Sequence, residues 1–422
     1  MRLNRDLLGI KTRKVTTGAQ VEKAVRDILA DVPDNGDAAV RGYAEKLDAF
    51  IGADLRVSEH EKEAAMRAAG NDFLRLMERA RRNIEEFHAN QTEKSWSIYK
   101  DNGVMMGQIV RPLKRVALYV PGGTASYPSS VLMNAVPAVL AGVENIVMFT
   151  PVKSDGKVAD AILAAAAASG VGTIYKIGGA HAVAAAAYGT QSIPKVDKIV
   201  GPGNIYVTTA KRMVYGEVDI DMIAGPSEVL IIADEKANPK YVAADLISQA
   251  EHDEMASAVL VTTSPKLIEQ TEAELSRQLA YLSRAEVIRR SLEDYGAAIL
   301  VDDLDKAFEI ANEIAPEHLE ILTENPLEKL PKVRNAGSIF LGENTPEPIG
   351  DYMSGTNHVL PTSGTAKFYS PLGVYDFVKY SSYSYYPRGV LDEYKDDVVK
   401  FAMLEGLDAH ANSIRVRFEL EQ

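Results

Sequence analysis

The feature that most constrains this chain is a repeated pattern of a short apolar strand, a turn containing glycine or proline, and a helix. The pattern occurs four times within about a hundred residues. The expected strands are residues 116–120, 145–149, 173–177 and 198–200. Strands that alternate with helices in this way form a parallel sheet covered by helices, so we expect an α/β lobe here.

A second α/β lobe is expected directly afterwards. Its predicted elements are strands 228–233, 257–262, 297–301 and 338–341 and helices 238–252, 266–289 and 304–314. Because no linker separates the two halves, we expect two α/β lobes around a cleft lined by the chemistry. Parallel sheets bind ligands at the carboxyl ends of their strands, where the glycine turns of the first lobe cluster. No G-x-G-x-x-G sequence follows a predicted strand, so the standard dinucleotide fingerprint is absent.

The segments that flank the lobes differ in character. Residues 19–88 show helical periodicity, and residues 93–107 predict a hairpin with its turn at 101–103. Trp96, in the first strand of this hairpin, is expected to pack in a core. After the lobes comes a tyrosine-rich tail with a strand-like stretch at 413–418, which we expect to wrap around a second subunit.

The composition excludes several classes of protein. The chain has 422 residues, too many for one ordinary core, and a formal net charge of −13, which argues against a nucleic-acid or anionic-membrane partner. It has no cysteine, so it offers no disulfide and no thiol nucleophile, and it must bind any metal through nitrogen and oxygen. The N-terminus lacks the apolar core of a signal peptide, and no apolar run is long enough to span a membrane. A cytoplasmic location is therefore expected.

Gln249 and His252 are the first candidate site residues. They are three residues apart at the end of a predicted helix, so their side chains project from one face. An amide oxygen and an imidazole nitrogen placed in this way can hold one cation, and Asp351 and His410 are candidates for the remaining ligands. Such a mixed oxygen and nitrogen site suits zinc or manganese. Alternatively, the pair is an ordinary helix end with a polar rim.

The adjacent residues Glu317 and His318 are the second candidate. A carboxylate beside an imidazole, directly after Pro316, provides two proton-transfer groups whose pKa values can differ. Alternatively, Glu317 occupies the first turn of a helix, where the helix dipole favours an acidic side chain.

Seven motifs in order resemble those of the L-histidinol dehydrogenase family. They are residues 119–123 (YVPGG), 198–204 (KIVGPGN), 224–228 (AGPSE), 248–253 (SQAEHD), 315–320 (APEHLE), 350–361 (GDYMSGTNHVLP) and 405–410 (EGLDAH). Each motif is modest alone, but together they cover nearly the whole chain from about residue 20 onward.

The resemblance implies a zinc-dependent, NAD-linked enzyme of histidine biosynthesis, with one zinc ion per subunit and manganese as an alternative metal. Such an enzyme oxidises L-histidinol to the aldehyde and then to L-histidine in two hydride transfers. The resemblance also implies two incomplete Rossmann-like lobes of the aldehyde-dehydrogenase kind, a helical N-terminal region, and an intertwined homodimer with its active site between subunits.

The resemblance also assigns roles to individual residues. The implied zinc ligands are Gln249, His252, Asp351 and His410, the last from the partner subunit. These ligands and His318 would also contact the substrate, together with Ser227 and Glu405. His318 would take the proton from the alcohol, and Glu317 would activate the water that attacks the aldehyde. Without a cysteine, the aldehyde must be oxidised as its hydrate, which requires such a base.

The implied cofactor residues are Tyr119, His181 and Asn204. At the second position the family more usually has glutamine, whereas this chain has histidine in the run 178–181 (GGAH). Histidine can still donate one hydrogen bond, but it can also become charged below about pH 6.5, so the strength of NAD binding is in question here.

The expected domains follow from these assignments. They are an N-terminal arm (1–20), a discontinuous metal-binding and catalytic lobe (21–115 and 229–365), a nucleotide-binding lobe (116–228), and a tail that contributes to the partner's active site (366–422).

Three other functions remain open at this point. A relative could oxidise another small polar alcohol, such as a sulfonated diol, although residues 225–228 and 405–410 favour histidinol. A metal-dependent hydrolase could use Glu317 as its base, but the chain lacks an H-E-x-x-H motif. A non-enzymatic two-lobe binding protein would not need every implied ligand and both proton-transfer residues.

Overall fold

The structure is a computed structural model that describes residues 2–3, 18–48, 50, 52, 54–122, 127–153 and 155–419. Most of the predicted N-terminal arm lies outside these residues. The chain forms two compact units. The larger comprises residues 1–92 and 113–377, and the smaller comprises residues 93–112 and 378–422.

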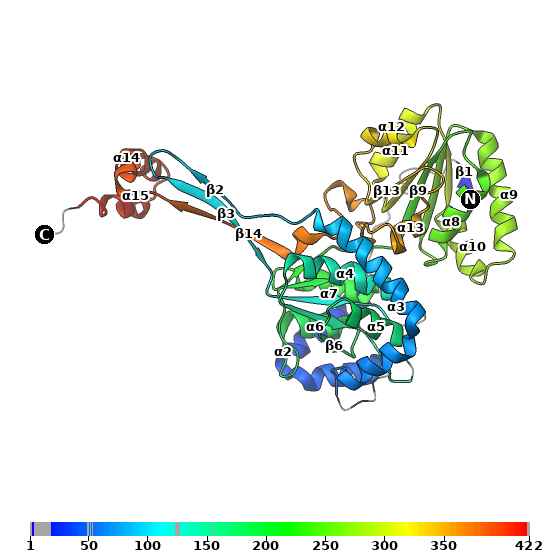
Figure 1. Cartoon of the computed structure of the whole chain (residues 1–422), viewed down its shortest axis with the longest axis horizontal. Helices are drawn as coiled ribbons and strands as arrows, with labels where there is room; N and C mark the ends of the chain where they lie inside the picture. Colours follow the sequence, from blue (N-terminus) through cyan, green and yellow to red (C-terminus); the bar gives the residue numbers. More distant parts are fainter. Residues whose placement is uncertain are drawn as a thin grey trace. The chain divides into compact units, whose positions relative to one another are not determined.

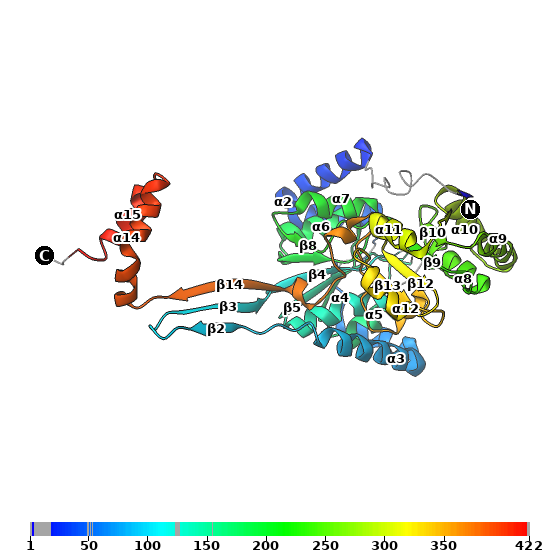
Figure 2. The same ribbon diagram turned by 90° about the horizontal axis from the view of Figure 1, so that it is seen from above.

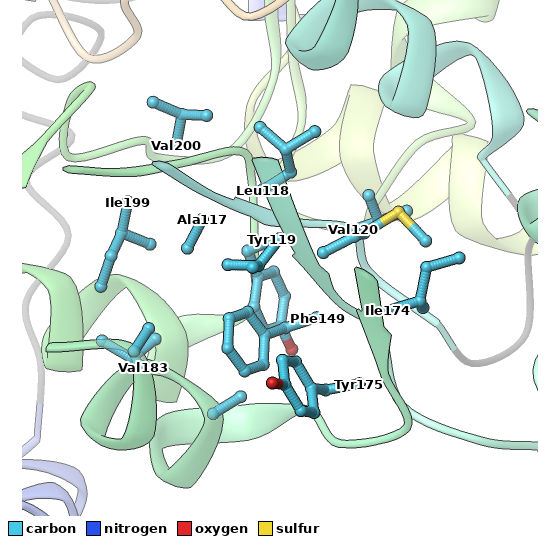
Figure 3. Packing of buried hydrophobic residues seen from close by; sticks show 14 of the residues in the cluster. Ala117, Leu118, Tyr119, Val120, Phe149, Ile174, Tyr175, Val183, Ile199 and Val200 are labelled. Atoms are coloured by element: carbon cyan, nitrogen blue, oxygen red, sulfur yellow. The ribbon is translucent and has the colours of Figure 1, made fainter. Parts of the chain in front are cut away.

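The first sheet of the larger unit is parallel, as predicted, with the strand order β6-β5-β4-β7-β8. Its strands are β4 (Arg115–Tyr119), β5 (Asn145–Phe149), β6 (Thr173–Tyr175), β7 (Lys198–Val200) and β8 (Asp219–Ile220). The helices between them are α4 (Pro128–Ala141), α5 (Asp160–Ala168), α6 (Gly179–Tyr188) and α7 (Ile205–Val214). Figure 3 shows the apolar core of this sheet, in which the rings of Phe149 and Tyr175 stack with their centroids 5.2 Å apart.

Two long N-terminal helices complete this lobe. Helix α2 (Ala19–Leu47) packs on α6 and α7, and helix α3 (Glu59–Ala89) packs on α4 and α5. Gly36, at φ +55°, interrupts α2. The prediction grouped residues 21–115 with the second lobe, whereas the buried side chains of both helices share one core with the first sheet. An amphipathic stripe shows that a helix is covered but does not identify the surface that covers it.

The second sheet of the larger unit is also parallel, with the order β1-β11-β10-β9-β12-β13. Its strands are β1 (Arg2–Leu3), β9 (Glu228–Ala233), β10 (Ser257–Thr262), β11 (Ala297–Leu300), β12 (His318–Leu322) and β13 (Ser338–Leu341). The helices are α8 (Pro239–Ala250), α9 (Pro265–Leu279), α10 (Ala285–Asp294), α11 (Leu304–Ile314), α12 (Pro326–Lys329) and α13 (Glu347–Tyr352). Short 3₁₀ turns occur at Leu330–Lys332, Thr365–Lys367 and Val374–Phe377.

Three predictions for this sheet were incomplete. The single helix expected over 266–289 is two helices, α9 and α10, because the chain turns at 280–284, where no glycine or proline marks a break. Strand β12 and helix α13 were not predicted. Strand β12 carries His318 and Glu320 among its apolar residues, and α13 has only six residues, too few to show a helical period.

The smaller unit is an antiparallel ribbon followed by two helices. Its strands β2 (Trp96–Tyr99), β3 (Met105–Pro112) and β14 (Val378–Tyr385) lie side by side in the order β14-β3-β2 (Figures 1 and 2). Helices α14 (Arg388–Leu404) and α15 (Asp408–Arg415) follow β14. The predicted hairpin is confirmed, with Gly103 at φ +84° in its turn.

Two predictions in the smaller unit were wrong. Trp96 is 51% exposed within the chain instead of buried, because a three-stranded ribbon has no second layer to cover it. Residues 413–415 belong to α15 and residues 416–418 form turns, although their alternating side chains suggested a strand. Among the described residues, no helix is both long and apolar enough to cross a membrane.

Candidate metal and catalytic site

The candidate site lies where the strands of the second sheet begin. Strand β9 starts at Glu228 and β12 starts at His318, and the register pairs His318 with Val229 on the neighbouring strand. Helix α8 runs in the opposite direction to the strands and ends beside them, which brings Gln249 to the same edge. The glycine turns of the first lobe instead follow the carboxyl ends of their strands, so only that lobe obeys the usual rule for parallel sheets.

Three side chains form the core of a possible metal site. One ligand atom from each of His252, Glu347 and Asp351 lies within 4.8 Å of the other two. The structure therefore brings together two of the four predicted ligands and adds Glu347, which was not predicted. Glu347 lies four residues before Asp351 on α13, a spacing that places both carboxylates on one face of the helix and that is present in the sequence.

Gln249 is the third predicted ligand in this region. It is 1% exposed, and neither its amide oxygen nor its amide nitrogen has a hydrogen-bond partner among the described residues. A buried amide without partners costs about 1–3 kcal/mol, so its position requires another explanation. An amide oxygen at the end of the helix that leads to His252 fits a divalent cation, and the donor set of imidazole, carboxylates and amide suits a borderline metal.

His318 is held in one orientation by the backbone of β9. Its Nδ1 lies 2.9 Å from the carbonyl oxygen of Glu228, so Nδ1–H donates there and the neutral ring keeps its lone pair on Nε2. Nε2 is buried, has no hydrogen-bond partner in the described structure, and lies 3.9 Å from Glu347 Oε1. Burial lowers the pKa of His318 to about 4, which keeps this nitrogen available as a base.

Glu317 is held by the same residue of β9. Its Oε2 accepts a hydrogen bond of 2.8 Å from the backbone N–H of Glu228 and lies 3.6 Å from His318 Nδ1. Burial, together with the nearby carboxylates of Glu228, Asp351 and Glu347, raises the pKa of Glu317 well above its ordinary value. A carboxylate with a raised pKa is a stronger base than an exposed one, which suits it to deprotonate water.

Two further groups shape the site. Burial raises the pKa of Glu347 to about 9, and the neighbouring Asp351 adds to this shift. His358 lies with Nδ1 3.2 Å from the backbone oxygen of Asp351 and with Nε2 3.3 Å from Ser130 Oγ, so it links α13 to α4. His358 lies within the 350–361 motif, and its role was not predicted.

The remaining predicted residues lie in three places. Ser227 is half-buried and immediately precedes β9. Glu405 and His410 are exposed residues of the smaller unit, at the end of α14 and in α15, and their part in the site stays a prediction. Tyr119 and Asn204 flank the glycine turns of the first lobe, where Asn204 caps α7 by accepting from two backbone N–H groups.

His181 is enclosed by the protein. It is 0% exposed, and its Nε2 lies 2.9 Å from Oδ2 of Asp48, which also accepts a 2.7 Å bond from the backbone N–H of Gly178. The hydroxyl of Tyr119 accepts from the N–H of Gly179 at 3.0 Å. His181 and Asp48 therefore hold the turn that begins α6.

Comparison with known proteins decides the family. The profile of the histidinol dehydrogenase family matches residues 11–418. The chain belongs to the histidinol dehydrogenase family. It is 62% identical to a histidinol dehydrogenase of Lactococcus lactis over 96% of this chain and 95% of the relative, and 56% identical to one of Clostridium acetobutylicum over 97% and 95%.

The fold agrees with this assignment. A crystal structure of histidinol dehydrogenase from Elizabethkingia anophelis superposes with a TM-score of 0.93 at 38% identity, covering 99% of this chain and 97% of that one. The predicted family and the predicted α/β fold with parallel sheets are thus confirmed.

The metal site can be tested by removing its ligands. We expect His252→Asn or Asp351→Asn to weaken binding of a divalent metal by roughly 100-fold or more, since even residues outside the ligand sphere contribute about 10- to 100-fold. Metal affinity would be measured by competition with a chromophoric chelator, with circular dichroism as the check on folding. The exposed His60→Asn on α3 is the control and should bind metal like the parent. Unchanged affinity in both site variants would contradict the assignment.

Proposed function

We propose that this protein oxidises L-histidinol to L-histidine through L-histidinaldehyde, with two molecules of NAD as hydride acceptors and one divalent metal per subunit. The observation that carries the proposal is the position of His318, whose free Nε2 is fixed beside side chains that could hold a metal and whose ring lies beside the carboxyl group of Glu317. The relatives that are histidinol dehydrogenases support the substrate and the place in histidine biosynthesis.

Zinc is the metal we propose, held by Gln249, His252 and Asp351 of one subunit and His410 of the partner subunit. When bound, the metal would supply the positive charge that orients the imidazole and amino nitrogens of the substrate, and NAD would supply the hydride acceptor. The unpartnered amide of Gln249 and the proximity of His252 to Asp351 support this assignment. Manganese has similar preferences for oxygen and nitrogen and remains the alternative.

His318 acts as the base for the alcohol. Its Nδ1–H is fixed on the Glu228 carbonyl, so only Nε2 can take the hydroxyl proton as the carbon loses hydride. The low pKa that burial gives His318 keeps Nε2 unprotonated at neutral pH in the free protein.

Glu317 acts in the second oxidation. In its ionised form it takes a proton from the water that adds to the aldehyde carbon, and the resulting hydrate can lose hydride to give the carboxylic acid. The N–H of Glu228 anchors one carboxyl oxygen, which leaves the other to meet water. This route needs no thiol, in agreement with a sequence that has no cysteine.

The first lobe is the proposed site of NAD. Its glycine turns lead into helix N-termini, and Asn204 is exposed there with an amide nitrogen available for a ligand. Tyr119 and His181 are buried, so we propose that in this chain they shape the β6–α6 turn.

A homodimer is proposed from the surface of the smaller unit. Along α14, Val398, Phe401 and Leu404 recur at helical spacing and are 40%, 69% and 76% exposed within the chain. Such a stripe is typical of a surface that a partner covers. We propose that a second copy covers it and that Glu405 and His410 act in the partner's site.

The stoichiometry of the reaction tests the proposed function. We expect two NADH per L-histidinol, read as absorbance of the reduced nicotinamide. The activity should disappear after chelation and return when zinc is added. One NADH with released aldehyde would overturn the second oxidation. No NADH would exclude oxidation of this alcohol, and a sulfonated diol would then be the next substrate tried.

The two bases can be separated by mutation. His318→Ala and Glu317→Ala should each lower turnover by about 10²- to 10⁴-fold, the usual contribution of a general base. Stopped-flow measurements should show that Glu317→Ala slows the oxidation of supplied histidinaldehyde more than that of histidinol. Metal content should match the parent in both variants. Normal aldehyde oxidation by Glu317→Ala would contradict its role.

The cofactor turn can be tested without turnover, through the dissociation constant of NAD measured by calorimetry. His181→Gln should change this constant by less than about threefold, because the side chain of His181 is fully buried and its Nε2 contacts Asp48. Asp48→Ala should raise it about tenfold, because Gly178 loses the acceptor of its backbone N–H. The opposite order, with a large effect of His181→Gln and none of Asp48→Ala, would show that His181 contacts the cofactor directly.

A further inference from the structure

Glu320 is a carboxylic acid in the middle of a hydrophobic core. It is 0% exposed on β12, and alternation along the strand places it on the same face as Leu322, while Leu319 and Ile321 point to the other face. The register sets it beside Ile231, which belongs to the core covered by α8. An apolar side chain would suit this position better, because burying a carboxyl group costs free energy unless its hydrogen bonds are satisfied.

The contacts of Glu320 reach two other elements of the site. Its Oε1 accepts a 2.8 Å hydrogen bond from the backbone N–H of Glu347, the first residue of α13. Its other oxygen is buried without a partner from an N–H or a cation in the described structure, and the carboxyl group in contact with it is that of Asp245. Asp245 is 8% exposed on α8, one helical turn before Gln249.

Two buried carboxyl groups in contact repel each other when both are charged, so this contact requires a proton between them. The contact is then a hydrogen bond between an acid and a carboxylate, which is among the stronger hydrogen bonds in proteins.

We propose that Glu320 and Asp245 are positioning residues that join β12, which carries the base His318, to the two helices α8 and α13, which carry metal ligands, in one rigid site. Glu320 lies two residues beyond His318, its hydrogen bond to Glu347 fixes the start of the helix that carries Asp351, and Asp245 fixes the turn of α8 that carries Gln249. Neither residue is placed to touch the metal or the substrate. The inference rests on the proposed function, because it concerns the geometry of the same metal site.

The experiment compares Glu320→Gln with Glu320→Leu. Glutamine can still accept from Glu347 N–H and donate to Asp245, so zinc affinity should stay within about threefold of the parent. Leucine is apolar and fills the space without either bond, so zinc affinity should fall about 10- to 100-fold. Excess zinc should restore much of the turnover of Glu320→Leu, an effect that a general loss of packing would not show. Affinity is measured by chelator competition on the full-length protein.

A matched control lies at the other edge of the same sheet. Asp234 is 7% exposed and accepts a 2.7 Å bond from the N–H of Glu324, far from the start of β12. Asp234→Leu should lower thermal stability and leave zinc affinity unchanged. If Glu320→Leu does not fold, Asp245→Ala on α8 breaks the same contact from the helix side and should weaken zinc binding at least fivefold.

Three outcomes would overturn the inference while leaving the proposed function intact. They are parent-like zinc affinity in Glu320→Leu or, failing its folding, in Asp245→Ala; equal damage by glutamine and leucine at position 320; and an equal loss of zinc affinity in Asp234→Leu. The proposed function fails on its own if the parent protein forms no NADH from L-histidinol with zinc present.

Discussion

The two proposed bases, Glu317 and His318, depend on the backbone of one residue, Glu228. The N–H of Glu228 holds Glu317 and its carbonyl holds His318, so the first residue of β9 orients both bases. Because backbone groups make both bonds, no substitution at this residue except proline removes the donor or the acceptor. What fixes them is the pairing of β9 with β12, which places His318 opposite Val229. The pairing of these two strands in the second sheet therefore also sets the positions of the two side chains.

The two sheets use opposite edges. In the first lobe, the glycine turns that Tyr119 and Asn204 flank follow the carboxyl ends of the strands, as expected for an α/β sheet. In the second lobe, the bases lie at the amino ends, and the C-terminal end of α8 brings Gln249 and His252 to them. This edge suits bases and metal ligands, because helix C-termini favour positive charge whereas helix N-termini favour anions.

The sequence predicted the parallel lobes because strands, turns and helices alternate clearly in it. For the candidate site it predicted Gln249 and His252 at one helix end and Asp351 as a further ligand, and the structure brings His252 and Asp351 together. It did not predict that the N-terminal helices complete the first lobe. An amphipathic stripe shows that one face of a helix is buried but does not show which part of the protein buries it. Glu320 and Asp245 were missed because each gains its meaning only from burial and from neighbours distant in sequence, and Glu347 was missed because a single pair of carboxylates four residues apart does not by itself indicate a metal site.

The proposed use of a carboxyl group and an imidazole at the start of β12, in place of a thiol, affects how sensitive the enzyme is to oxidants. Enzymes that oxidise aldehydes through a thiolate lose activity when peroxide converts that sulfur to higher acids. Here the proposed bases are oxygen and nitrogen groups, and the chain has no cysteine at all. Reagents that inactivate such dehydrogenases by modifying the catalytic thiol therefore have no thiol to modify in this chain.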